Sequence, residues 1–165
     1  MKISSGSMLL GAILLSNQLL AADVIRHKTP NSDFPIAMAV EIPEGKTQVY
    51  LSGAGPSIAD KSLPPTSPAA YGNTRDQTIS TLEKIKATLQ SIKLEMKDVV
   101  KMQVFLVGDP AMAGKMDFAG FMEGYVKYFG AAAGQPNLPS RSTMQVAGLA
   151  NPGWLVEIEV TAVRK

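Results

Sequence analysis

Two segments of the chain repeat apolar residues at intervals of three and four, the spacing of one face of an α-helix. In residues 75–92, just after the potential capping residues Asn73 and Thr74, the repeated positions are Leu82, Ile85, Leu89 and Ile92. In residues 115–129 they are aromatic: Phe118, Phe121, Tyr125 and Tyr128. We therefore predict two amphipathic helices, and we expect the aromatic stripe to be core rather than a cofactor site.

The strand pattern is found in short runs rich in apolar and β-branched residues. Residues 36–43 and 47–52 flank a Gly-containing turn and predict a hairpin. Residues 99–107 predict a single strand, and residues 139–165 predict two closing strands. Between these elements, residues 23–35 are interpreted as an irregular lead-in, and residues 53–73, rich in Gly, Pro, Ser and Ala, as a long loop that is functional or mobile.

The predicted order β-β-α-β-α-β-β indicates an α+β fold, with one mixed sheet and two helices packed on one face. Residues 99–107 and 155–163 are apolar at both alternating sets of positions, which indicates burial on both faces of the sheet. Two helices cannot cover both faces. The pattern therefore predicts a homo-oligomer whose subunits cover the second face.

The first 22 residues follow a different pattern. Lys2 precedes the apolar run 8–15, and "LLAAD" supplies small residues for cleavage near Ala21 or Ala22. This is typical of a secretory signal peptide, and the run is shorter than the roughly 20 residues that span a bilayer. We expect export to the periplasm or the medium, with no membrane association after cleavage. An uncleaved anchor is the alternative.

Composition narrows the chemistry of the remaining chain. Sixteen Lys and Arg residues against 14 Asp and Glu residues give a net charge of +2, and no dense basic run suggests nucleic acid. Cysteine is absent and His27 is the only histidine. Thiolate catalysis and a Cys-based zinc site are therefore excluded, and we expect no metal. A Ser-His-Asp triad would have to use His27 and would be contrived.

The closing strands carry charges where apolar residues would suffice. Because side chains alternate between faces, Arg141, Thr143 and Gln145 share one face of their strand. On the last strand Glu157 and Glu159 oppose the apolar set Val156, Ile158, Val160 and Ala162, which should carry the helices. We expect the polar sets to point toward the subunit contact.

Two interpretations of these charges remain open. Arg141 and a glutamate could form a salt bridge between subunits. Alternatively, Arg141 offers a planar fork to a ligand carboxylate, and Glu157 offers a carboxylate that orients a water molecule. Burial would raise the pKa of that glutamate and a nearby arginine would lower it, and the residues alone do not decide which effect is larger.

Several separated segments together resemble one family. "VYLSGAGP", "DQTISTLEKIKATLQ", "KDVVKMQVFLVGD", "DFAGFMEGYVKYF", "PSRSTMQVAGL" and "VEIEVTAVRK" follow the order and spacing of the RidA (YjgF) family, whose members are also named reactive intermediate deaminases or endoribonuclease L-PSP-like proteins. The resemblance covers residues 36–165. It implies a chorismate-mutase-like α+β fold, a homotrimer with outward helices, and ligand sites in the clefts between subunits.

The resemblance also implies an activity. Active members hydrolyse enamines and imines to 2-oxo acids and ammonia, and they need no cofactor. By this resemblance Arg141 binds the substrate carboxylate, Glu157 positions the attacking water, Ser52 and Gly53 line the pocket wall, and Thr143 stands where many members have cysteine. The expected partners are a carboxylate substrate, a 2-imino or 2-oxo acid, and other copies of the chain.

Three departures from the family pattern keep other functions open. Phe34 is the only aromatic residue near the site of a family tyrosine, Met122 replaces a family asparagine, and loop 53–73 is longer than in short members. The alternative is therefore a trimer of the same fold that binds carboxylic acids without catalysis. A third possibility is a protein-interaction role. The small net charge argues against the ribonuclease activity that one family name suggests.

Overall fold

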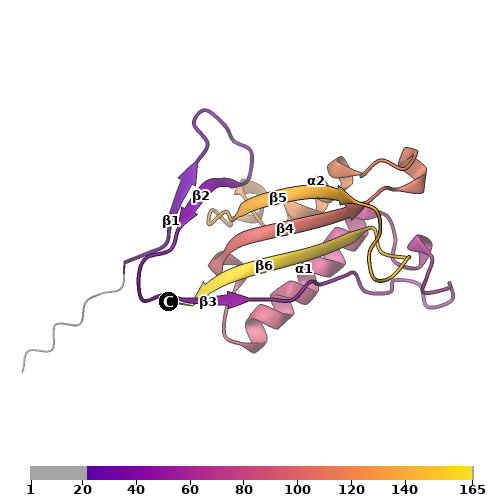
Figure 1. The fold of residues 1–165 in the computed structure, drawn as a ribbon, viewed down its shortest axis with the longest axis horizontal. Coiled ribbons are helices and arrows are strands. Elements are labelled where there is room, and N and C mark those ends of the chain that lie inside the picture. Colours follow the sequence, from indigo (N-terminus) through magenta and orange to yellow (C-terminus); the bar gives the residue numbers. More distant parts are fainter. Residues whose placement is uncertain (1–21, 165) are drawn as a thin grey trace, which may run out of the picture.

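The computed structural model describes residues 22–164, which form one mixed sheet with two helices on one face (Figure 1). The sheet has six strands in the order β1-β2-β5-β4-β6-β3. The strands are β1 (Ile25–Lys28), β2 (Ala37–Glu41), β3 (Thr47–Tyr50), β4 (Val99–Val107), β5 (Ser140–Val146) and β6 (Val156–Arg164). The predicted α+β architecture is confirmed, whereas residues 1–21 of the predicted signal peptide lie outside the described residues.

The two helices follow from their capping residues and buried stripes. Helix α1 (Thr74–Ser91) begins where the Asn73 side chain accepts a hydrogen bond from the Asp76 amide, and it buries Leu82, Ile85 and Leu89. Helix α2 (Phe118–Tyr125) is shorter than the predicted 115–129. Its N-cap is Asp117, whose side chain accepts a hydrogen bond from the Gly120 amide at 2.8 Å. This cap fixes the first turn and therefore the start of the helix.

The centre of the sheet is formed by β4, which pairs in parallel with β5 and antiparallel with β6. Met102, Val104 and Leu106 of β4 are fully buried beneath the helices. They pair with Val160, Ile158 and Val156 of β6, so the predicted apolar face of the last strand is confirmed. Burial of these side chains is the main favourable contribution to folding, at roughly 1.5–3 kcal/mol for each large one.

The second face of the sheet is not covered by any element of the described residues. It carries Phe105, Glu157 and Met144, which are neighbours in the register of β6, β4 and β5. Met144 is 37% exposed, and Tyr50 of β3 is 74% exposed. Phe105 and Met144 are paired neighbours, and together with Tyr50 they leave apolar surface on this face, which indicates an interaction surface. This agrees with the inference that the two helices are too few to cover both faces.

The predicted hairpin between residues 36–43 and 47–52 is wrong. Strand β2 pairs with β1 and, through Ala37 and Ser140, with β5, whereas β3 pairs antiparallel with β6. The turn that contains Gly45 therefore joins β2, near one edge of the sheet, to β3 at the other edge (Figure 1). Val49 of β3 packs against the core, and this burial favours pairing of β3 with the edge of β6 over pairing with β2.

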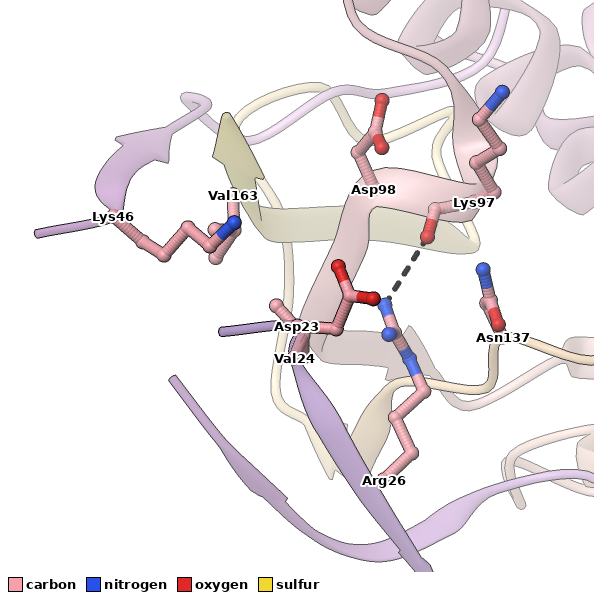
Figure 2. Close-up of a pocket in the computed structure, with 8 residues that line it drawn as sticks. All are labelled: Asp23, Val24, Arg26, Lys46, Lys97, Asp98, Asn137 and Val163. Carbon is pink, nitrogen blue, oxygen red and sulfur yellow. Dashed lines mark hydrogen bonds between the residues drawn. The ribbon is translucent and has the colours of Figure 1, made fainter. Parts of the chain in front are cut away.

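The lead-in 23–35 is likewise not irregular throughout, because it contains β1. The Arg26 guanidinium and Nε–H donate to three backbone carbonyls, of Leu138 at 3.2 Å, Lys97 at 3.1 Å and Val99 at 3.1 Å. Figure 2 shows the bond to Lys97 together with the surrounding polar side chains. Burial lowers the pKa of Arg26, an effect that the nearby Asp98 partly offsets. This clamp fixes a polar segment as an edge strand.

Loop 53–73 is anchored at its C-terminal end. Tyr71 is buried, its hydroxyl donates to the Pro65 carbonyl at 2.9 Å, and the Asn151 amide donates to that hydroxyl at 3.0 Å. A Cβ on Gly153 would lie 2.6 Å from the Tyr71 ring, so glycine is required for this close approach. The loop thereby packs against the connection between β5 and β6.

Candidate functional site

Arg141 lies on β5 with its side chain on the helix-bearing face of the sheet. It pairs with the buried Met102, and its Nη2 donates to the thioether sulfur of Met122 in α2 at 3.2 Å. A thioether is a weak acceptor. Its Nη1 is buried and has no hydrogen-bond partner among the described residues. The guanidinium is therefore polar, positively charged and incompletely satisfied.

Aromatic rings surround this guanidinium. Its Cζ lies 4.3 Å from the ring centroid of Tyr125, 4.9 Å from that of Phe121, 5.5 Å from that of Phe34 and 5.9 Å from that of Phe118. Each ring face attracts the cation, with the buried Tyr125 and Phe121 as the nearest. Burial lowers the pKa of Arg141 and Tyr125 partly restores it, but an arginine stays protonated in proteins.

The salt bridge that remained open for Arg141 joins two subunits, so it stays a prediction in a structure of one chain. No ion pair among the described residues includes Arg141. Aromatic faces compensate only part of the free energy of removing a cation from water. A ligand carboxylate could supply the missing acceptors in a bidentate geometry, which is the interaction that arginine favours.

Thr143 extends this polar position along β5. It lies two residues beyond Arg141 on the same face, and its Oγ1 is also buried without a partner among residues 22–164. Buried polar atoms are rarely left unpaired. Two such atoms, Arg141 Nη1 and Thr143 Oγ1, therefore mark one side of a binding site. We call Arg141, Thr143 and Met122 the arginine half-site.

Glu157 belongs to a different group of residues. It lies on the uncovered face, where it pairs with Phe105 of β4. The strand extension after β3 passes directly beside it, because Ala54 bridges to Ile158. A Cβ on Gly53 would lie 2.5 Å from Glu157 Oε1, so a larger residue would displace the carboxylate from this position. Gly53 and Glu157, with the exposed Ser52 that precedes Gly53 in the chain, make up what we call the glutamate half-site.

The expectation that Arg141 and Glu157 share a face of the sheet is wrong for a single chain. Met102 pairs with both Arg141 and Val160, and Val160 lies three residues from Glu157. An odd offset along a strand reverses the face. Alternation within one strand shows which of its own side chains share a face. Which side chains of different strands share a face depends on the register between β4, β5 and β6.

The aromatic wall of the arginine half-site was not predicted. The helical spacing of Phe118, Phe121 and Tyr125 indicated core, which is confirmed for Phe121 and Tyr125 but only partly for Phe118, which is 36% exposed. Phe34, 45% exposed, comes from the loop before β2 and joins the other rings over the guanidinium. The one available signal of this wall was the length of the aromatic stripe, which runs from Phe118 to Tyr128 and so extends beyond the end of α2.

Comparison with known proteins places this geometry in a family. Residues 31–164 match the family described as endoribonuclease L-PSP, and the chain belongs to it. A RutC family protein of Pyrococcus horikoshii is 33% identical over 83% of this chain and 95% of its own length. A RutC family protein of Saccharolobus solfataricus is 31% identical over 84% of this chain and 94% of its own length.

Solved structures support the same fold. The Rid protein family member YyfB of Yersinia pestis has a TM-score of 0.60 at 21% identity, covering 85% of this chain and 96% of its own. The structure of E. coli TdcF with bound serine has a TM-score of 0.53 at 29% identity, covering 79% of this chain and 93% of its own. The fold of this chain is thus the YjgF fold.

Two further observations concern residues 22–164 only. No group of three or more His, Asp or Glu side chains in this range is arranged to hold a metal ion. None of the helices in the same range is long and apolar enough to cross a membrane.

Proposed function

We propose that the protein is a deaminase that hydrolyses enamines and imines, converting reactive 2-imino acids to 2-oxo acids and ammonia in clefts between subunits of a homotrimer. The observation that carries this proposal is the guanidinium of Arg141, which lies among aromatic rings with no carboxylate partner in the described chain. Family membership supports it. The bound serine of the TdcF structure is a carboxylate ligand of a related protein.

The proposal requires two copies of the chain at each site. The arginine half-site faces the helices and the glutamate half-site faces away from them, so residues of one chain cannot close around one small substrate. The uncovered sheet face offers Phe105, Met144 and Tyr50 for contact with a second copy. A cyclic trimer would bring the arginine half-site of one copy to the glutamate half-site of the next.

The reaction needs little beyond orientation and proton transfer. An enamine first tautomerises to the imine, whose carbon is already electrophilic. Arg141 holds the carboxylate, and Glu157 orients a water molecule and accepts its proton as the oxygen bonds to the imine carbon. Glu157 passes this proton to the imine nitrogen, which gives the neutral carbinolamine. Glu157 then accepts the proton of the new hydroxyl group and delivers it to the nitrogen as the C–N bond breaks, so that ammonia leaves and the 2-oxo acid remains. No oxidant, metal or organic cofactor is required.

A second candidate function is binding of carboxylic acids without turnover. It is favoured by two residues at the arginine half-site, Met122 and Phe34, which replace the asparagine and tyrosine of the family pattern. Met122 Sδ can accept only weakly, and Phe34 has no hydroxyl. In this function Glu157 would line the cleft without activating water.

One assay separates the two functions. An amino-acid oxidase generates a 2-imino acid, and semicarbazide traps the fraction that has not been hydrolysed. Purified protein should reduce trapping, and Arg141→Ala and Glu157→Gln should each restore it. Calorimetry with a 2-oxo acid is run in parallel. If the protein binds the acid through Arg141 but never reduces trapping, the binding function replaces the deaminase.

We also propose that the chain is exported through the segment 1–22. Lys2 and the apolar run 8–15 support this proposal. Expression of the full chain in a Gram-negative host, followed by fractionation and N-terminal sequencing, should recover a periplasmic form that begins near Ala22 or Asp23. Recovery of the intact chain in the cytoplasm would contradict export and leave the cleft chemistry untouched.

A further inference from the structure

An apolar hollow lies beside the arginine half-site. Its volume is about 520 Å³, and it lies between the loop before β2 and the segment that follows α2. The lining includes Phe34, Pro35, Ile36, Ala131, Pro136 and Leu138. This volume exceeds what a methyl or ethyl group would need, and its lining resembles the mostly apolar walls of small-molecule sites.

Two residues connect the hollow to the guanidinium. Phe34 lines the hollow, and its ring centroid lies 5.5 Å from Arg141 Cζ. Pro35 also lines the hollow, and its carbonyl accepts a hydrogen bond at 2.8 Å from the hydroxyl of Tyr125, whose ring lies 4.3 Å from the same atom. Phe34 and Pro35, in the loop before β2, therefore connect the hollow to the surroundings of the cation.

We propose that this hollow receives the side chain of the substrate, so that the protein acts on 2-imino acids with bulky apolar or aromatic side chains. The inference rests on the proposed carboxylate binding by Arg141. The acid group would satisfy Arg141 Nη1 and Thr143 Oγ1, and the side chain would pass along Phe34 into the hollow. Met122, a flexible and polarizable side chain, is the group that must yield its contact with Nη2.

The walls argue against a polar or very small side chain. Near Arg141 the neighbours are mainly rings and a thioether, and in this arrangement the acid group occupies Thr143 Oγ1, so no good hydrogen-bond partner among these neighbours remains for a substrate hydroxyl. The partly exposed rings of Phe34 and Phe118 gain most from contact with another apolar or aromatic group. The charged lining residues are Lys28, the last residue of β1, and Asp33 in the loop before β2, and both are exposed.

The test measures binding of pyruvate, 2-oxo-4-methylpentanoate and phenylpyruvate to the assembled wild-type protein by calorimetry. Transfer of a benzyl group from water to the hollow should make phenylpyruvate bind about tenfold or more tightly than pyruvate. Ala131→Trp should fill the hollow and remove this preference while leaving pyruvate affinity unchanged. Ala132→Trp is the matched control, because Ala132 is exposed on the same turn and does not line the hollow.

Phe34→Ala provides a second variant that removes the aromatic wall without adding volume, and it should reduce the ratio of phenylpyruvate to pyruvate affinity. Equal affinity of the wild type for all three acids would overturn the inference and leave the proposed carboxylate site standing. A preference that survives Ala131→Trp would overturn it as well. Absence of binding by any acid would instead reject the carboxylate site, and the inference with it.

Discussion

Arg141 and Glu157 point to opposite faces of the same sheet, although the strands that carry them both flank β4. Each residue has its own surroundings: Arg141 lies among aromatic rings and a thioether, and Glu157 lies against the backbone of Gly53. The chain thus presents two incomplete sites rather than one complete one. Assembly is therefore part of the chemistry that we propose.

Complementation between variants tests this arrangement. Arg141→Ala and Glu157→Gln should each lose deaminase activity, because each disables every site in a homotrimer. Trimers assembled from an equal mixture should regain about a quarter of wild-type activity, since each site draws its halves independently from two copies. Activity is measured after co-refolding or co-expression. A mixed trimer, verified by mass spectrometry, that stays inactive would show that both residues act within one chain.

Arg141→Met should lose binding of 2-oxo acids without losing stability. Burial penalises the charged guanidinium, and no carboxylate in the described chain compensates for it. Replacement of an uncompensated buried charge by an apolar side chain of similar length is commonly neutral or stabilising, here by up to about 1 kcal/mol. Thermal unfolding and calorimetry measure the two effects. A large drop in melting temperature would mean that the cation is structural.

Gly53→Ala should reduce turnover more than it reduces ligand binding. The new Cβ would lie 2.5 Å from Glu157 Oε1, so the carboxylate must move away from the water that we propose it orients. A displacement of this size can cost about a hundredfold in rate. Gly148→Ala is the control, because a Cβ there meets nothing within 4 Å. Equal turnover of both variants would remove Glu157 from the mechanism.

Alkaline unfolding should report the buried Tyr125. Burial raises the pKa of Tyr125 above its ordinary value near 10, an effect that Arg141 partly opposes. A folded-state pKa above the unfolded one contributes stability that is fully present below about pH 10 and is lost as the pH rises through the folded value. Denaturant titrations between pH 8 and about 12 measure this loss.

The matched variants for that titration are Tyr125→Phe and Tyr50→Phe. Tyr125→Phe removes the hydrogen bond to the Pro35 carbonyl, so it should cost about 1 kcal/mol at neutral pH. It should also make the alkaline decline shallower. Tyr50 is 74% exposed in the single chain, and Tyr50→Phe keeps the ring that we propose contacts a second copy, so this replacement should change neither quantity. An unchanged alkaline slope in Tyr125→Phe would assign the decline to other groups.

Arg26→Ala should release β1 from the rest of the sheet. Its three hydrogen bonds to backbone carbonyls would be lost, and those carbonyls must then find water. We expect a cost of about 1–3 kcal/mol in the free energy of unfolding, together with faster amide exchange in β1 and β2. Lys28→Ala, at an exposed position of the same strand, is the control. Unaltered exchange in β1 would show that backbone pairing alone holds it.

The sequence predicted the elements better than their pairing. The spacing of Leu82, Ile85 and Leu89 located α1, and the alternation in 156–162 located the buried face of β6, because both depend only on local periodicity. The hairpin prediction failed because the turn at Gly45 fits a hairpin, whereas the partners of β2 and β3 are chosen by distant strands. Register is a nonlocal property, and it also placed Arg141 and Glu157 on different faces.

In the candidate site, too, the sequence predicted residue types but not the contacts that depend on distant parts of the chain. The residue types of Arg141, Glu157 and Gly53 pointed to carboxylate and water chemistry through a family resemblance. Within the described part of the chain Arg141 Nη1 has no partner, and this could not be predicted, since it depends on which side chains of α2 reach the guanidinium. The contribution of Phe34 depends on the path of a loop, on which periodicity gives no information.

Arg141 Nη1 has no hydrogen-bond partner among residues 22–164, so binding of a physiological ligand there can be detected through the stability of the protein. Any compound that binds only the native state and completes this hydrogen-bonding group raises the melting temperature, by an amount set by its concentration relative to its dissociation constant. A metabolite library screened by differential scanning fluorimetry, against Arg141→Met as a blank, would rank natural compounds whatever reaction the protein catalyses. The protein can thus serve as the assay for its own substrate.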